Sequence, residues 1–160
     1  MKKQIRKGIF ETNSSSVHAL CIPKNEPYTL PNEVIFQVGE YGWGPDEEYN
    51  TANYLYTTLL YLEMDDKLQE LKEILARHGV TAVFKKPRND DWYVDHAGCF
   101  DEDHNFLEDI FKDEDKLLRY LFCPSSYILI FNDNMSTDEY WKELEHKEQD
   151  ENLEVYEKWN

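Results

Sequence analysis

The spacing of apolar and polar residues along the chain predicts an alternation of strands and helices. Short apolar or β-branched runs that end near proline, glycine or asparagine predict strands over residues 5–10, 17–22, 33–38, 80–84 and 127–131. Apolar residues at helical spacing predict helices over residues 50–64, 65–78 and 101–122, and a last helix that begins at Thr137. We expect Asp65 to cap the second helix and Gly79 to end it.

This order of elements predicts the fold class. Strands near both ends of the chain, with helices between them, favour one α+β domain over residues 1–160. We expect a mostly antiparallel sheet of about 4–6 strands with the helices packed on it. The continuous apolar run 127–131 predicts an interior strand, and residues 133–160 predict an acidic C-terminal helical segment.

The charge of the chain restricts its partners. The formal net charge is −16 and the pI is about 4.6. Basic residues are concentrated at the beginning of the chain, where Glu11 is the one acid within residues 1–24. Most of the surface will repel phosphate, so direct nucleic-acid binding is disfavoured. A basic protein that handles nucleic acid is a better partner for such a surface, although acidity also serves simple solubility.

The cysteine count and the N-terminus indicate the compartment. The three cysteines, Cys21, Cys99 and Cys123, are too few and odd in number for a disulfide framework. The N-terminus is charged but lacks the apolar region of a signal peptide, and no apolar run is long enough to span a membrane. We therefore expect a cytoplasmic protein with reduced thiols.

Two H-x-x-C pairs suggest a metal site. His18 and Cys21 form the first pair, and His96 and Cys99 form the second, which together could close a tetrahedral zinc site. In a straight strand, however, residues three apart point to opposite faces, so His18 and Cys21 should not share a site. We predict a structural zinc bound by His18, Asp95, His96 and Cys99, with Cys21 as a substitute ligand. Asp95 could instead orient an imidazole.

The polar run before residue 17 supports an alternative hypothesis, in which the protein is an enzyme. Ser14, Ser15 or Ser16 with His18 and an acid such as Glu11 or Asp95 has the group types of a nucleophilic triad. The same polar run with His18, Asp95 and His96 could instead line an open metal or acid/base site, and either enzyme would act on a nucleotide or protein substrate. The chain lacks a G-x-S-x-G nucleophile elbow. We therefore expect residues 12–16 to hydrogen-bond a tight connection between strands 5–10 and 17–22 in an N-terminal hairpin.

Four motifs resemble a known group of proteins. They are the opening Phe10-Glu-Thr-Asn-Ser-Ser-Ser-Val-His18, the segment 39–43, the Tyr-Val-Asp-His run at 93–96, and the run from Phe122 to an Asn-Asp-Asn at 132–134. This pattern is similar to small phage and prophage proteins of Firmicutes. Some small acidic prophage proteins are anti-CRISPR proteins that block type II Cas9. Together with the acidity, the resemblance implies an inhibitor of Cas9, of type II-A, that acts in the cytoplasm of a bacterial host cell.

The combined prediction is a non-enzymatic, metal-stabilised inhibitor. Its acidic surface would dock on a basic domain of Cas9 and prevent target DNA from loading, without contacting nucleic acid or membrane itself. The predicted partner-binding residues lie on the acidic helix and the acidic tail: Asp101, Glu102, Asp103, Glu108, Asp109, Glu143, Glu145 and Glu148.

Overall fold

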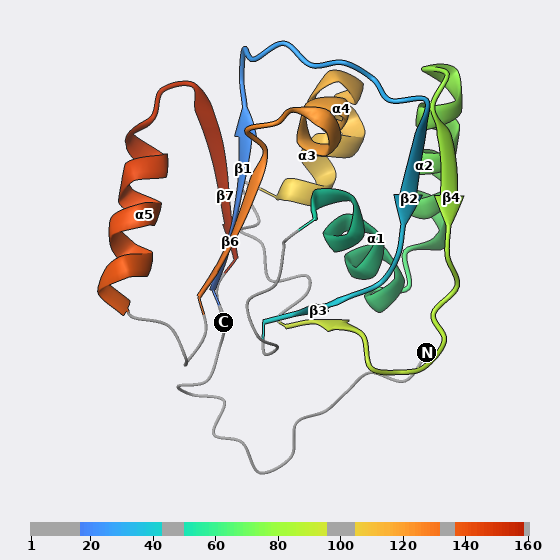
Figure 1. The fold of residues 1–160 in the computed structure, drawn as a ribbon, viewed down its shortest axis with the longest axis horizontal. Coiled ribbons are helices and arrows are strands. Elements are labelled where there is room, and N and C mark those ends of the chain that lie inside the picture. Colours follow the sequence, from blue (N-terminus) through green and yellow to red (C-terminus); the bar gives the residue numbers. More distant parts are fainter. Residues whose placement is uncertain (1–16, 43–49, 96–104, 132–136, 159–160) are drawn as a thin grey trace.

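The computed structural model of the protein describes residues 17–42, 50–95, 105–131 and 137–158. Within these ranges the chain has an α+β fold, which confirms the predicted class (Figure 1). The elements in chain order are β1 Val17–Pro23, β2 Glu33–Phe36, β3 Glu40–Tyr41, α1 Thr51–Tyr61, α2 Asp65–Arg77, β4 Thr81–Phe84, β5 Tyr93–Val94, α3 Phe106–Lys112, α4 Glu114–Phe122, β6 Tyr127–Phe131, α5 Thr137–Gln149 and β7 Leu153–Lys158.

The main sheet is antiparallel and has the order β6-β1-β7. β1 is therefore central, and His18 pairs with Ile130 of β6 on one edge and with Lys158 of β7 on the other. Both edges of β1 are occupied, by β6 and β7, and residues 5–10 of the expected N-terminal hairpin lie outside the described residues. The run 127–131 has the predicted bounds and its middle residues are buried, but the central position belongs to β1.

β7 was not expected, because residues 133–160 were predicted to be helical. The helix ends at Gln149, and the chain turns back through Asp150 to form a strand from Leu153. Tyr156 of this strand is buried and packs edge-to-face on Phe106, with ring centroids 5.6 Å apart. The segment is rich in glutamate, which is depleted in strands, so its composition does not predict this strand. Its pairing with β1 stabilises it.

The two faces of the main sheet are covered by different helices. Leu20 and Ile22 of β1 belong to the large core that also contains residues of α1, α3 and α4. Ala19 of β1 and Leu129 of β6 point to the opposite face, where Leu144 of α5 covers them. Among the described helices, Figure 1 shows α5 on one side of the sheet and α1, α2, α3 and α4 on the other.

Two further strand pairs are parallel. β2 pairs with β4, and β3 pairs with β5, each in a two-stranded sheet. α1 and α2 lie between these strands in the chain and form the crossover that a parallel pairing requires. The described strands therefore form a smaller antiparallel sheet than the predicted 4–6 strands, together with two parallel pairs.

The helix boundaries follow local capping. Asn50 caps α1 by accepting a hydrogen bond from the Asn53 N–H at 2.9 Å, and Gly79 has a φ of 74° just after α2, as expected. Asp65 is the first residue of α2 rather than its cap. The single helix predicted over 101–122 is wrong, because Asp113 ends α3 in an extended conformation and caps α4. None of the helices that the structure describes is long and apolar enough to cross a membrane.

Candidate functional site

His18 lies in the core beneath α1. It shares a face of β1 with Leu20 and Ile22 and is fully buried. A hydrogen bond of 2.7 Å joins its Nδ1 to the Tyr54 hydroxyl of α1. Burial raises the pKa of Tyr54 well above its ordinary value, so the phenol keeps its proton at neutral pH. This hydrogen bond joins the buried side of β1 to α1.

Asp95 is linked to the same place through Tyr41. Because β3 and β5 are parallel, their carboxyl ends lie at one edge, where the Asp95 N–H donates to the Tyr41 carbonyl at 2.8 Å. The Tyr41 ring packs edge-to-face on Tyr54, with centroids 5.0 Å apart. The structure thus connects His18, Tyr54 and Tyr41 through their side chains and Asp95 through its main chain, and we name these four residues the His18 cluster.

The structure tests only part of the predicted metal site. His18 and Asp95 join the His18 cluster from distant parts of the chain, whereas His96 and Cys99 lie outside the described residues. Because Nδ1 of His18 bonds Tyr54, a metal bond from this ring would be made by Nε2. Within the described ranges no three His, Cys, Asp or Glu side chains gather as ligands. Zinc at this site stays a prediction.

Cys21 does not fit the role of substitute ligand. It follows Ala19 in pointing to the α5 face of the sheet, as strand alternation predicts, whereas His18 points to the other face. Burial raises the pKa of the Cys21 thiol to about 11, which disfavours the thiolate that binds zinc. Cys21 is a small buried side chain that packs against α5.

The enzyme alternative depends on residues that the structure does not describe. Glu11, Ser14, Ser15 and Ser16 lie outside the described ranges. His18 is described, and its side chain has no solvent-exposed area. A general base must reach the proton that it removes, so a buried His18 supports packing and orientation better than catalysis.

The acidic residues of α3 differ in what they contact. Asp101, Glu102 and Asp103 lie outside the described residues. Glu108 is exposed, with its carboxylate 3.7 Å from the Lys112 ammonium. Asp109 accepts a hydrogen bond of 2.9 Å from the Tyr156 hydroxyl and so ties α3 to β7. Asp109 is therefore part of the fold rather than a freely presented charge.

The acidic residues of α5 are exposed. Glu143 hydrogen-bonds Tyr127, and burial together with this bond raises the pKa of Tyr127 to about 12. Glu145 accepts from Gln149 at 3.2 Å. A hydrogen bond with the nearby Glu157 carboxyl raises the pKa of Glu148, which means that two carboxylates are held close together.

Trp141 is a residue that the sequence-based prediction missed. Its side chain is 40% exposed on α5, and it is spaced at i, i+4 and i+7 with Glu145 and Glu148 on one helix face. We name Trp141, Glu145 and Glu148 the α5 acidic face. Helical spacing in the sequence contained this signal, since it places an aromatic side chain of the kind enriched at interfaces on one helix face with two glutamates.

The two acidic helices do not form one surface. α3 packs on the face of the main sheet that holds Tyr156, and α5 packs on the face that holds Ala19 (Figure 1). The predicted partner-binding residues are therefore divided between two sides of the molecule, and the exposed ones of the described chain lie mainly on α5. No family model, curated protein or solved structure matches the chain.

Proposed function

We propose that the protein is a non-enzymatic acidic inhibitor that binds a basic nucleic-acid-binding surface of another protein through the α5 acidic face. The single observation that carries this proposal is the exposure of Trp141 on the same face of α5 as the exposed carboxylates of Glu145 and Glu148. Tryptophan is enriched among interface residues that dominate binding energy. Carboxylates around it select a basic partner and repel nucleic acid.

The Glu148–Glu157 pair adds a reason for a cationic partner. Two carboxylates that share a hydrogen bond repel each other once both are ionised, and the raised pKa of Glu148 reflects this contact. A lysine or arginine of the partner would relieve the repulsion. The electrostatic attraction between this cation and the two carboxylates would weaken as the salt concentration rises.

The resemblance to small phage proteins makes Cas9 the specific partner of this proposal. A basic groove of Cas9 holds nucleic acid through its phosphates, and an acidic surface competes for the same cations. The inhibitor would then prevent target DNA from loading in the cytoplasm of the bacterial host. A structural zinc at the His18 cluster would hold β1 against the segment after β5.

A cleavage assay tests the inhibitor. The guide-loaded Cas9 complex is incubated with a molar excess of the protein before target DNA is added. We expect the Glu145→Lys, Glu148→Lys double variant to raise the half-inhibitory concentration at least about tenfold. The matched control, Glu33→Lys with Glu73→Lys, changes the net charge equally at exposed positions away from α5. Its half-inhibitory concentration should stay within about twofold of the wild-type value. Absence of inhibition by the wild type, or equal inhibition by both variants, would contradict the proposal.

Metal analysis tests the zinc separately. Protein purified without a histidine tag should contain about one zinc per chain, and a chelator should lower its melting temperature. The variant His18→Ala should lose the metal. Metal-free protein with an unchanged melting temperature in chelator would leave the inhibitor proposal standing and remove zinc from it.

A further inference from the structure

Among the strands that the structure describes, β4 has an open backbone edge. The N–H groups of Thr81 and Lys85 donate to the carbonyls of Asn32 and Phe36, each at 2.9 Å, so these alternate residues face β2. In a parallel pair the intervening residues direct their N–H and C=O groups to the opposite edge. Ala82 and Phe84 therefore present their backbone groups away from β2. Among the strands of the described chain, β4 has no second partner.

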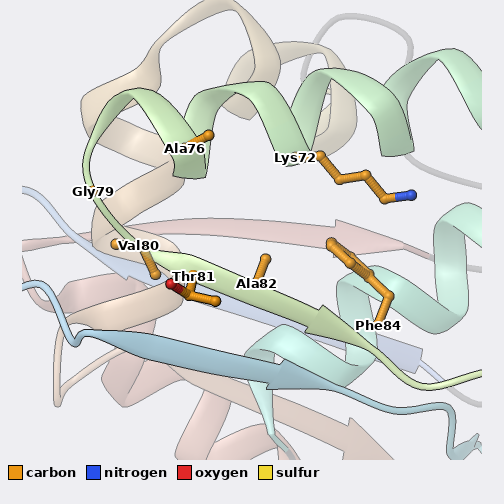
Figure 2. A pocket seen from close by; sticks show the side chains of 7 residues that line it. All are labelled: Lys72, Ala76, Gly79, Val80, Thr81, Ala82 and Phe84. Carbon is orange, nitrogen blue, oxygen red and sulfur yellow. The ribbon is translucent and has the colours of Figure 1, made fainter.

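A groove lies beside this edge, between β4 and α2 (Figure 2). Its volume is about 620 Å³. Figure 2 shows the Ala82 and Phe84 side chains on β4 and those of Ala76 and Lys72 on α2. The remaining lining residues are Gly79, Val80 and Thr81. The Lys72 ammonium lies over the Phe84 ring, 5.1 Å from its centroid. The groove thus combines the apolar side chains of Ala76, Ala82 and Phe84 with the Lys72 cation at the carboxyl end of β4.

Further cations gather at this end of the strand. Lys85, Lys86 and Arg88 follow β4 directly and are exposed, in a protein whose net charge is −16. Neither they nor Lys72 form an ion pair with any residue in the described part of the chain. We name Lys72, Lys85, Lys86 and Arg88 the β4 cations. Their unmatched charge is complementary to an acidic ligand.

The outer face of the β2–β4 pair is also unusual. Ile35 and Val83 are register partners, and their side chains are 45% and 37% exposed. An open strand edge beside exposed apolar side chains tends to acquire another strand. The edge, the groove and the exposed pair therefore favour the same kind of ligand, an extended peptide.

We propose that the β4 edge binds an extended acidic peptide segment of a partner protein by strand addition. The backbone of the peptide would bond to the N–H and C=O groups of Ala82 and Phe84. Every second side chain would enter the groove against Ala76 and Ala82, and acidic side chains would pair with the β4 cations. This surface is separate from the α5 acidic face, so the inference is independent of the inhibitor proposal.

The probe is a fluorescein-labelled octapeptide of alternating valine and glutamate with blocked ends, and binding is followed by fluorescence anisotropy. We expect saturable binding that weakens with salt. The Lys85→Glu, Lys86→Glu variant should raise the dissociation constant about tenfold. The control variant, Lys112→Glu with Lys142→Glu, changes the net charge equally at exposed cations of α3 and α5. Its dissociation constant should stay within about twofold of the wild-type value.

Two modified peptides test the strand geometry without altering the protein. In one, the valine amides are N-methylated, and in the other the glutamate amides are. Because alternate amides of a strand face opposite edges, one modification should abolish binding and the other should leave it nearly unchanged. Equal effects of both would overturn strand addition.

Other outcomes also decide against the proposal. No binding at millimolar peptide would mean that the lysines only protect an open edge from self-association. Tighter binding of a single-stranded oligonucleotide of equal charge would assign the β4 cations to phosphate instead. Equal binding by the two charge-reversal variants would show that the peptide binds elsewhere.

Discussion

The two faces of the β6-β1-β7 sheet differ in how much of the fold depends on them. On one face, Leu20 and Ile22 enter the large core formed with α1, α3 and α4. On the other face, the buried cluster consists of Ala19, Leu129 and Leu144, with Tyr127 and Val155 packed beside it. Apolar burial stabilises roughly in proportion to its area, so the first face holds the fold together and the second holds mainly α5.

This difference explains where the molecule can place exposed charge. A helix attached by a small cluster can carry carboxylates and a tryptophan on its outer face without disturbing the main core. On the other side of the sheet, Asp109 and Glu154 are both bonded to the Tyr156 hydroxyl and support the packing there. The same residue types therefore serve structure on one face, whereas on the other face they are exposed and form part of the surface that we propose binds a partner.

The largest expected effect comes from removing a core aromatic ring. Phe106 is fully buried and packs edge-to-face on Tyr120 and Tyr156, with centroid distances of 4.8 and 5.6 Å. We expect Phe106→Ala to lower the free energy of unfolding by about 3–5 kcal/mol, measured by urea denaturation. A loss below about 1 kcal/mol would show that this face is not the main source of stability.

A smaller and more local effect is expected on the α5 face. Leu144→Ala should lower the free energy of unfolding by about 2 kcal/mol. The small cluster around Leu144 should be able to open locally while the main core stays folded. Hydrogen exchange should then rise in α5 while the amides of α1 and α4 keep their protection. If exchange rises equally in all three helices, the two faces form one cooperative unit and the comparison fails.

The buried hydrogen bond of the His18 cluster gives the next effect. Tyr54→Phe removes the hydroxyl bonded to His18 and should cost about 1–2 kcal/mol, since a buried polar ring then loses a partner. The matched control is Tyr28→Phe, which removes a more exposed bond to Asp115 and should cost less than about 0.5 kcal/mol. Both are compared by thermal melting, and equal costs would contradict a special role for the cluster.

The smallest effect concerns pH. The folded-state pKa of Glu148 is raised by its hydrogen bond with Glu157, so the stability linked to this group is present at low pH and lost as pH rises through the folded pKa. Glu148→Gln should therefore stabilise the protein at neutral pH, by less than about 0.5 kcal/mol because the site is largely exposed. This increase in the free energy of unfolding should vanish at pH values below the ordinary pKa of glutamate.

A carboxylate on the other side of the sheet should behave oppositely. The hydrogen bond from Tyr28, with a further bond from Arg119, lowers the pKa of Asp115. Its stabilisation is present above the unfolded-state pKa and lost as pH falls through the folded pKa. Asp115→Asn should therefore destabilise at neutral pH. The same sign for Asp115→Asn and Glu148→Gln in pH-dependent melting would contradict these assignments.

The candidate site was predicted only where local rules apply. Strand alternation separated His18 from Cys21 correctly, because side-chain direction in a strand has a period of two. The link from His18 to Asp95 runs through Tyr54 and Tyr41, which have no distinguishing sequence spacing. The open edge of β4 was also missed, since an edge is defined by the absence of a neighbouring strand rather than by its own residues.

The sequence by itself determined the elements whose causes are local. Apolar periodicity placed α1, α2 and β6, and Gly79 marked the end of α2 because its positive φ suits glycine. Only the tertiary structure decided that β1 is central, that β7 is a strand, and that Asp113 divides α3 from α4. These features depend on which distant surfaces bury one another, and contacts of that kind leave no fixed spacing along the chain.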